Sequence, residues 1–241
     1  MKLLVINPNT TASMTQAIDD VAQRISRPET RVVTVQPDSG PASIQGFLDI
    51  ARSLDGILTI ADQHKDADAT VVACFDDTGL DALRCIMDGP VIGIGESSFH
   101  AASMIACRFS VVTTLSRSIV GITDNLAKYG LVTRCSSIRA SEVPVLALES
   151  DPDAARARIE AEISGALKND GAEAIVLGCS GMASFTDSLT AKFGVPVIDG
   201  ISSAVAMAEA LVSVGLKTSK IGAYASENTG ISLVERAIVD A

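Results

Sequence analysis

The sequence predicts an α/β fold built from parallel sheets. Short apolar runs rich in Val, Ile and Leu alternate with longer amphipathic stretches along the 241 residues. Several runs are apolar at every position, which is typical of parallel strands covered on both faces. In addition, three blocks of the sequence recur in the same order further along the chain. Together these observations indicate two similar lobes, each a mostly parallel sheet flanked by helices.

The expected elements follow from the apolar pattern. The predicted strands are 3–7, 31–36, 69–74, 90–94, 109–114, 173–179 and 196–200. The predicted helices are 11–25, 44–65, 79–87, 97–107, 116–129, 151–169 and 201–214. Asp151 before Pro152 is a favourable start for a helix. Residues 133–148 are expected to hold a short strand, SSIRA, and then an irregular connection. GIGES (93–97) lacks the GxGxxG spacing of a nucleotide-binding loop and predicts a turn.

The internal repeat divides the chain into two halves. LLVINPNTTASM resembles FSVVTTLSRSIV, TVVACFDDTGLDA resembles AIVLGCSGMASF, and GPVIGIGESS resembles VPVIDGISSA. The spacing is 105 residues from Cys74 to Cys179 (179 minus 74) and 106 from Pro90 to Pro196 (196 minus 90). This period is too long for a solenoid. We therefore expect residues 1–105 with 216–241 to form lobe 1, which carries Cys74, and residues 106–215 to form lobe 2, which carries Cys179.

The composition excludes several classes of protein. Hydrophobic residues make up 47% and charged residues 20%, so the chain can bury a sizeable core. A net charge of −10 and 3% aromatic residues argue against a nucleic-acid partner. No apolar run is long enough to span a membrane. Five cysteines, an odd number without CxxC spacing, indicate reduced thiols and a cytoplasmic protein, and with only two histidines we expect no metal.

Cys74 and Cys179 are the candidate reactive groups. Each follows an apolar strand at an equivalent place in its half of the repeat. Ligands of parallel α/β sheets bind beyond the carboxyl ends of the strands, so two facing lobes would place the two thiols across one cleft. A thiolate on one side of a carbon acid and a thiol on the other can invert that carbon without a cofactor. Taken alone, a buried cysteine at a strand end is more often an inert core residue than a catalytic one.

The residues after the thiols refine this hypothesis. Residues 75–79 and 180–182 are expected to open helices directly after Cys74 and Cys179, and N–H groups at a helix start lower a thiol pKa. A carboxylate touching Cys74 would raise its pKa instead. We therefore expect Asp76 and Asp77 to point away, as helix caps or toward polar groups of a substrate. Thr113 and Thr114 end a strand and offer hydroxyls, and Asn9 is either an amide donor or a helix cap.

Five motifs occur in order along the chain: INPNTT (6–11), PASIQG (41–46), VVACFDDTGLDA (71–82), FSVVTT (109–114) and EAIVLGCSGM (173–182). Together they resemble the Asp/Glu racemase superfamily, in its hydantoin and allantoin racemase branch. The resemblance covers nearly the whole chain. It implies a cofactor-independent racemase that inverts C5 of a 5-substituted hydantoin or of allantoin, with Cys74 and Cys179 as the two bases. It also implies substrate contacts from Asn9, Thr10, Ile44, Phe75, Asp76, Thr114, Ser180 and Gly181. Hydantoin racemases often have Pro and Ala where this chain has Thr78 and Ser180.

Two other functions stay open at this point. A decarboxylase or a maleate isomerase-like enzyme of the same superfamily would share the fold, although a decarboxylase needs only one thiol. A two-lobed small-molecule binding protein would leave both thiols unreactive. In each case the expected partner is a small molecule, and apolar helices such as 201–214 indicate a homo-oligomer.

Overall fold

The computed structural model describes residues 1–225 and contains two parallel four-stranded sheets. The first has the order β2-β1-β3-β4 and the second β6-β5-β7-β8. The two sheets therefore share one topology, in which β1 to β4 correspond in order to β5 to β8. The strands are β1 Lys2–Ile6, β2 Arg31–Val35, β3 Ala69–Val72, β4 Val91–Gly93, β5 Phe109–Thr113, β6 Cys135–Ala140, β7 Ala174–Gly178 and β8 Val197–Ile198. The predicted α/β class and the internal repeat are confirmed.

The helices are α1 Ala12–Ile25, α2 Phe47–Gln63, α3 Leu80–Ile86, α4 Ile94–Ile105, α5 Ile119–Lys128, α6 Ala147–Ser150, α7 Pro152–Asn169, α8 Thr186–Phe193 and α9 Gly200–Ser213. Asp151 caps α7 as expected, because its carboxylate accepts from the N–H of Ala154. The turn expected at GIGES is wrong, since β4 runs directly into α4. The sequence did not predict α8.

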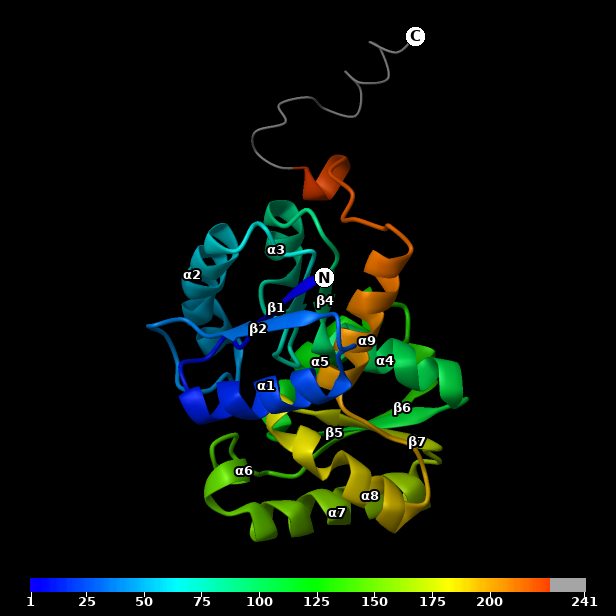
Figure 1. Cartoon of the computed structure of the whole chain (residues 1–241). Helices are drawn as coiled ribbons and strands as arrows, with labels where there is room; N and C mark the ends of the chain where they lie inside the picture. The colour runs from blue at the N-terminus through cyan, green and yellow to red at the C-terminus, as the bar shows by residue number, and fades with distance from the viewer. Residues whose placement is uncertain (226–241) are drawn as a thin grey trace.

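Each lobe covers part of the other lobe's sheet. Helix α4 follows the first sheet in sequence but packs on β7 of the second, and α9 follows the second sheet but packs on β3 and β4 of the first. The two helices also pack on each other, and Figure 1 shows them between the sheets. The predicted division into lobes stays a prediction, and residues 226–241 of its first lobe lie outside the described residues.

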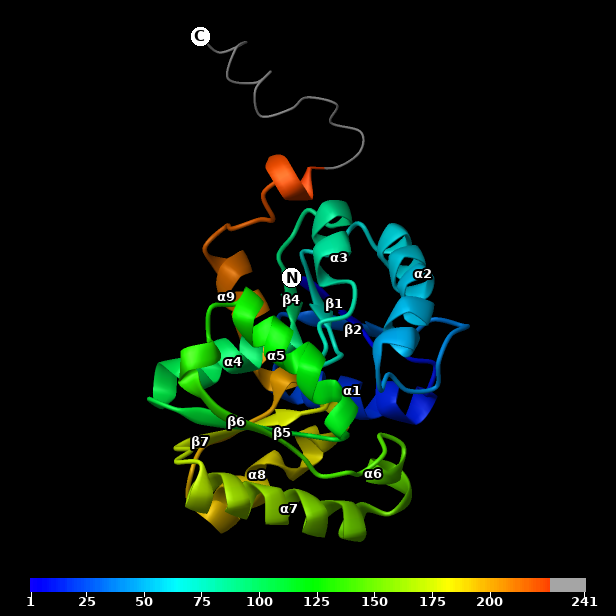
Figure 2. The same ribbon diagram turned by 180° about the vertical axis from the view of Figure 1, so that it is seen from behind.

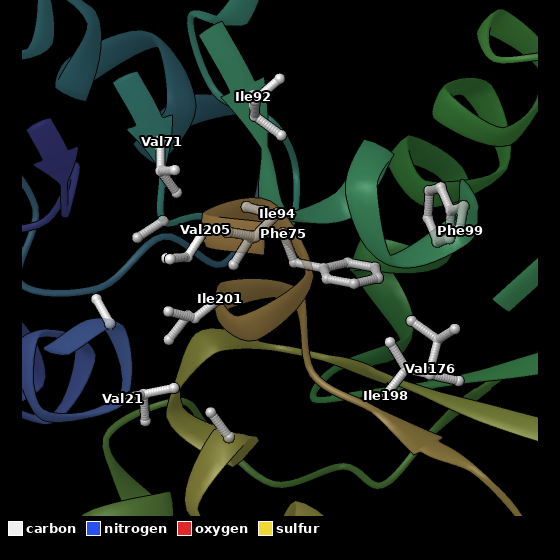
Figure 3. Packing of buried hydrophobic residues seen from close by; sticks show 14 of the residues in the cluster. Val21, Val71, Phe75, Ile92, Ile94, Phe99, Val176, Ile198, Ile201 and Val205 are labelled. Atoms are coloured by element: carbon white, nitrogen blue, oxygen red, sulfur yellow. The ribbon is translucent and has the colours of Figure 1, made fainter. Parts of the chain in front are cut away.

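One hydrophobic cluster joins the two sheets. It contains Val71 and Ile92 of the first sheet, Val176 and Ile198 of the second, and Phe75 between them. Figure 3 shows these side chains around the first turns of α9. The Phe75 ring meets that of Phe99 edge-on, with 5.3 Å between centroids. Because these side chains lose their contacts if the sheets separate, the cluster holds the lobes in a defined relative position.

Glycines allow three segments to meet at the centre. A Cβ on Gly93 would lie 2.1 Å from Asp77 Oδ1, and one on Gly95 would lie 2.4 Å from the Phe75 carbonyl oxygen. A Cβ on Gly200, at the start of α9, would lie 2.4 Å from the carbonyl oxygen of Ile94. Contacts this short exclude any side chain at these positions. The glycines of GIGES therefore bring the start of α4 against the turn that follows Cys74.

Hydrogen bonds to Asp77 hold the turn after Cys74 against the start of α4. Its carboxylate accepts hydrogen bonds from the N–H groups of Gly95 (2.9 Å) and Glu96 (2.8 Å), which would otherwise be unpaired at the start of α4, and from the Tyr129 hydroxyl (2.7 Å). The residue is buried and has a φ of 52°, a conformation that Asp and Asn tolerate better than most residues. The prediction that the acids act as helix caps is thus confirmed for Asp77.

Replacing Asp77 by Asn tests this cap without changing the backbone preference. The amide NH2 would face the N–H of Gly95 or Glu96 and leave a buried donor without an acceptor. We expect Asp77→Asn to lower the free energy of unfolding by about 2 kcal/mol, measured by urea denaturation at pH 8. Asp124→Asn, the same change on the exposed side of α5, should shift it by less than about 0.5 kcal/mol. Equal stability of the two variants would contradict the proposed importance of the cap.

Candidate active site

The two repeat-related thiols line one cavity between the lobes. Cys74 lies just beyond the end of β3 and Cys179 just beyond the end of β7, and both are partly buried. The cavity holds about 420 Å³ of space free of protein atoms, including open solvent at its mouth. Its walls are formed by Asn9, Met14, Ile44, Ala73, Cys74, Phe75, Asp76, Thr113, Thr114, Ser118, Val145, Gly178, Cys179 and Ser180.

The structure gathers most of the predicted site residues at this cavity. Six of the predicted substrate contacts line it with the two thiols: Asn9, Ile44, Phe75, Asp76, Thr114 and Ser180. Thr10 and Gly181 do not. The N–H and the hydroxyl of Thr10 both donate to the carbonyl of Pro41, and the N–H of Gly181 donates to the sulfur of Cys179. The roles assigned to all of these residues in catalysis and substrate binding stay predictions.

Two of the lining residues also have structural tasks. The Asn9 side-chain oxygen accepts from the N–H of Thr11 (2.9 Å), just before α1, so both interpretations of this residue are compatible with its position. Phe75 is only 5% exposed and belongs to the core cluster between the sheets. These residues therefore hold the cavity wall in place as well as forming it.

Burial dominates the electrostatics of the thiols. It raises the pKa of Cys179 to about 11, with the nearby Asp76 carboxylate adding to the rise and the N–H of Gly181 opposing it. Burial and Asp76 raise the pKa of Cys74 further. The Thr78 hydroxyl, 3.5 Å from the Cys74 sulfur, partly opposes this rise. Cys179 also raises the pKa of Cys74, which reflects their proximity. The expected lowering of the thiol pKa values is therefore wrong.

The geometry after the cysteines explains this outcome. Only Cys179 is followed directly by helical turns, the 3-10 segment Ser180–Phe185. After Cys74 the chain makes a turn around Asp77 and Gly79, and α3 begins at Leu80. Cys74 consequently has no helix start behind it, contrary to the prediction, although the Thr78 hydroxyl and the Asp76 N–H partly offset its burial.

Helix α5 supports the turn after Cys74 from the other lobe. Asn125 donates from its side chain to the Asp76 carbonyl (3.1 Å), and Tyr129 donates to the Asp77 carboxylate. The Asp76 side chain remains in the cavity, and burial raises its pKa to about 6. At neutral pH this carboxylate is charged and available to accept a hydrogen bond from a bound molecule.

The sequence did not single out several lining residues. Met14 comes from α1, Ser118 from the turn before α5, and Val145 from the irregular segment before α6. Ser118 is in a predicted helix and carries no pattern of its own. Only tertiary packing brings these residues to the thiols.

The described residues contain neither a metal-binding cluster nor a membrane-spanning helix. Within 1–225, His, Cys, Asp and Glu side chains nowhere gather in threes at metal-binding geometry. In that part of the chain, no helix combines the length and apolar character that crossing a bilayer requires.

The paired sheets and shared thiol cavity define a two-lobed α/β protein with a candidate two-base site. The chain belongs to the Asp/Glu/Hydantoin racemase family, whose model matches residues 3–208. It is 48% identical over 227 residues to a hydantoin racemase of Rhizobium meliloti, covering 93% of this chain and 94% of that protein. It is 45% identical over 226 residues to a hydantoin racemase of Pseudomonas sp. (strain NS671), covering 93% and 91%.

A solved structure supports the same relationship. The allantoin racemase from Klebsiella pneumoniae superposes with a TM-score of 0.92 at 42% identity, covering 94% of this chain and 93% of that chain. The predicted family resemblance is confirmed.

The Asp76 charge provides a test of the site's electrostatics. Above pH 6 the wild-type carboxylate is ionised and raises both thiol pKa values, so Asp76→Asn should lower them. At pH 8 we expect iodoacetamide to alkylate Cys74 and Cys179 about tenfold faster in this variant, as followed by peptide mass spectrometry. The exposed Cys107 should react equally in both proteins. Unchanged rates at Cys74 and Cys179 would refute the assigned effect of the carboxylate.

Proposed function

We propose that this protein is a racemase that inverts C5 of a hydantoin-type ring, a 5-substituted hydantoin or allantoin, without a cofactor. The observation that carries the proposal is the pair of repeat-related thiols, Cys74 and Cys179, in one cavity. The relatives named hydantoin racemase and allantoin racemase support the choice of ring.

The proposed reaction uses the two thiols in opposite states. A thiolate removes the C5 proton from one face of the ring, and the electron pair moves onto the neighbouring carbonyl to form an enolate. The thiol on the other face then gives its proton to C5. The S–H bond formed on the first cysteine replaces the one lost from the second. The product has the opposite configuration, and the enzyme is left ready for the reverse reaction.

The cavity supplies groups that suit the ring. The hydroxyls of Thr114, Ser118 and Ser180 line it and would donate to the ring carbonyls, including the one that becomes an oxyanion. The Asp76 carboxylate would accept from a ring N–H. That hydrogen bond would draw its negative charge away from the thiols and ease thiolate formation, which burial and the Asp76 carboxylate oppose.

Serine variants of the thiols test the two-base scheme. A hydroxyl is a much weaker base than a thiolate, so Cys74→Ser and Cys179→Ser should each reduce inversion of an optically pure 5-substituted hydantoin by about 10³-fold, measured by polarimetry. In D2O each variant should still exchange the C5 hydrogen of one enantiomer, a different one in each case. Cys107→Ser should behave as the wild type. Wild-type inversion by either site variant would discard the scheme.

We also propose that the chain self-associates in the cytoplasm. The cysteines of the described residues are all free, which suits a reducing compartment. Met104 and Ile105 at the end of α4 are 75% and 59% exposed, and Val214 after α9 is 69% exposed. Exposed apolar side chains such as these favour burial against another subunit. We expect light scattering after size-exclusion chromatography to give a mass above 24.9 kDa, and a monomer would refute the proposal.

A further inference from the structure

A buried amide, Asn7, is hydrogen-bonded to a residue of the thiol cavity's wall without lining the cavity itself. Asn7 directly follows β1 and is completely buried, whereas its partner Asn9 is 5% exposed and forms part of the wall. Both lie just before α1, which supplies Met14 to the same wall, and Figure 2 shows this helix between the first sheet and α6. Asn7 can therefore influence a bound molecule through Asn9 but not by touching it.

A backbone N–H group fixes the orientation of the Asn9 side chain. The N–H of Thr11 lies 2.9 Å from Asn9 Oδ1. Because a backbone N–H can only donate, the oxygen of the amide and not its nitrogen must face Thr11. Asn7 Nδ2 donates to the same oxygen at 3.1 Å. Two donors thus hold the Asn9 oxygen, and the NH2 group is left on the other side of the amide.

The Asn7 amide is fixed in the same way. Its Oδ1 accepts from the N–H of Asn9 (3.3 Å), so its NH2 group must face Asn9 Oδ1 and the Thr15 hydroxyl (2.9 Å). The Thr15 hydroxyl in turn donates to the side-chain oxygen of Gln36, whose Nε2 donates to the carbonyl of Thr10 (2.8 Å). Both ends of the Asn7 amide are therefore paired, and the network opposes a turn of either asparagine.

The NH2 group of Asn9 has only a weak partner among the described residues. Its Nδ2 lies 3.7 Å from the sulfur of Met14, which lines the cavity as well. An amide nitrogen carries two hydrogens, so at least one is available to a bound molecule. The hydroxyls of Thr114, Ser118 and Ser180 can rotate and can also accept, whereas this donor has a fixed direction. A fixed donor needs no reorganisation when charge develops on an oxygen beside it.

We propose that Asn7 is a positioning residue, which holds the Asn9 amide so that its NH2 group donates to the ring carbonyl next to C5. The inference rests on the proposed function, because the enolate oxygen forms on this carbonyl only when the ring lies between the thiols. Asn7 acts through Asn9 Oδ1. By donating to that oxygen it also makes the Asn9 NH2 group a stronger donor, since hydrogen bonds in a chain polarise one another.

Asn7→Asp tests the positioning role with almost no change of shape. One carboxylate oxygen can still accept from the N–H of Asn9, but the other replaces the NH2 group and repels Asn9 Oδ1. We expect kcat for a 5-substituted hydantoin to fall about tenfold with KM changed less than about threefold, because the donor matters most at the enolate. Exchange of the C5 hydrogen in D2O should slow equally for both enantiomers. Asn169→Asp, the same change at the exposed end of α7, should match the wild type.

A double-mutant cycle separates positioning from a structural or electrostatic effect of Asn7. Asn9→Ser keeps a hydroxyl that can accept from the Thr11 N–H and removes the amide that Asn7 orients. Alone it should lower kcat about 10²-fold. In the Asn9→Ser background, Asn7→Asp should cost less than about a further twofold, since no amide is left to orient. A purely structural role, or a simple effect of the new charge on the thiols, would cost the same in both backgrounds.

Asn7→Ser gives a second reading of the same cycle, and it serves where Asn7→Asp does not fold. It removes the NH2 donor without adding a charge, so it should also lower kcat about tenfold in the wild type and less than about twofold beside Asn9→Ser. Equal losses in the two backgrounds, or wild-type kcat in the Asn7 variants, would overturn the inference. A wild-type protein that racemises neither a 5-substituted hydantoin nor allantoin would instead overturn the proposed function.

Discussion

The close approach of α4 to the turn after Cys74 is the constraint on which the rest of the structure depends. Gly93 and Gly95 remove the side chains that would keep the two segments apart, and Asp77 then pairs the free N–H groups at the helix start. Because α4 packs on the second sheet, this contact also joins the turn of one lobe to the body of the other. The position of Cys74 relative to Cys179 follows from that junction.

The same junction explains why the site disfavours ionisation of its thiols. The turn that places Cys74 also places the largely buried Asp76 carboxylate at the same cavity, where it opposes ionisation of both thiols. Such a site retains its protons until a ligand supplies a partner for the carboxylate. In the proposed racemase the ring N–H would be this partner, so thiolate formation would be linked to binding. The thiols would then be protected from oxidation and alkylation in the free protein.

Much of the fold could be predicted because its signals are local. Continuous apolar runs identify strands, and the repeat places Cys74 and Cys179 at equivalent strand ends that the structure brings to one cavity. The exchange of α4 and α9 between sheets could not be predicted, since an apolar helix face does not specify which sheet covers it. The raised thiol pKa values were also missed. They depend on burial and on the direction of Asp76, and neither is encoded in the spacing of residues.

The two thiols are equivalent by repeat but differ in their surroundings. Gly181 N–H at the start of a 3-10 segment supports Cys179, whereas Cys74 has the higher pKa. In the proposed racemase, the free protein with one thiolate would therefore hold it mainly at Cys179. Since two enantiomers in water have equal free energy, kcat/KM must nevertheless be the same in both directions. The asymmetry would be expressed instead in which enantiomer meets a protein whose thiolate is already on the reacting side. The other enantiomer would react only after a proton had moved from Cys74 to Cys179.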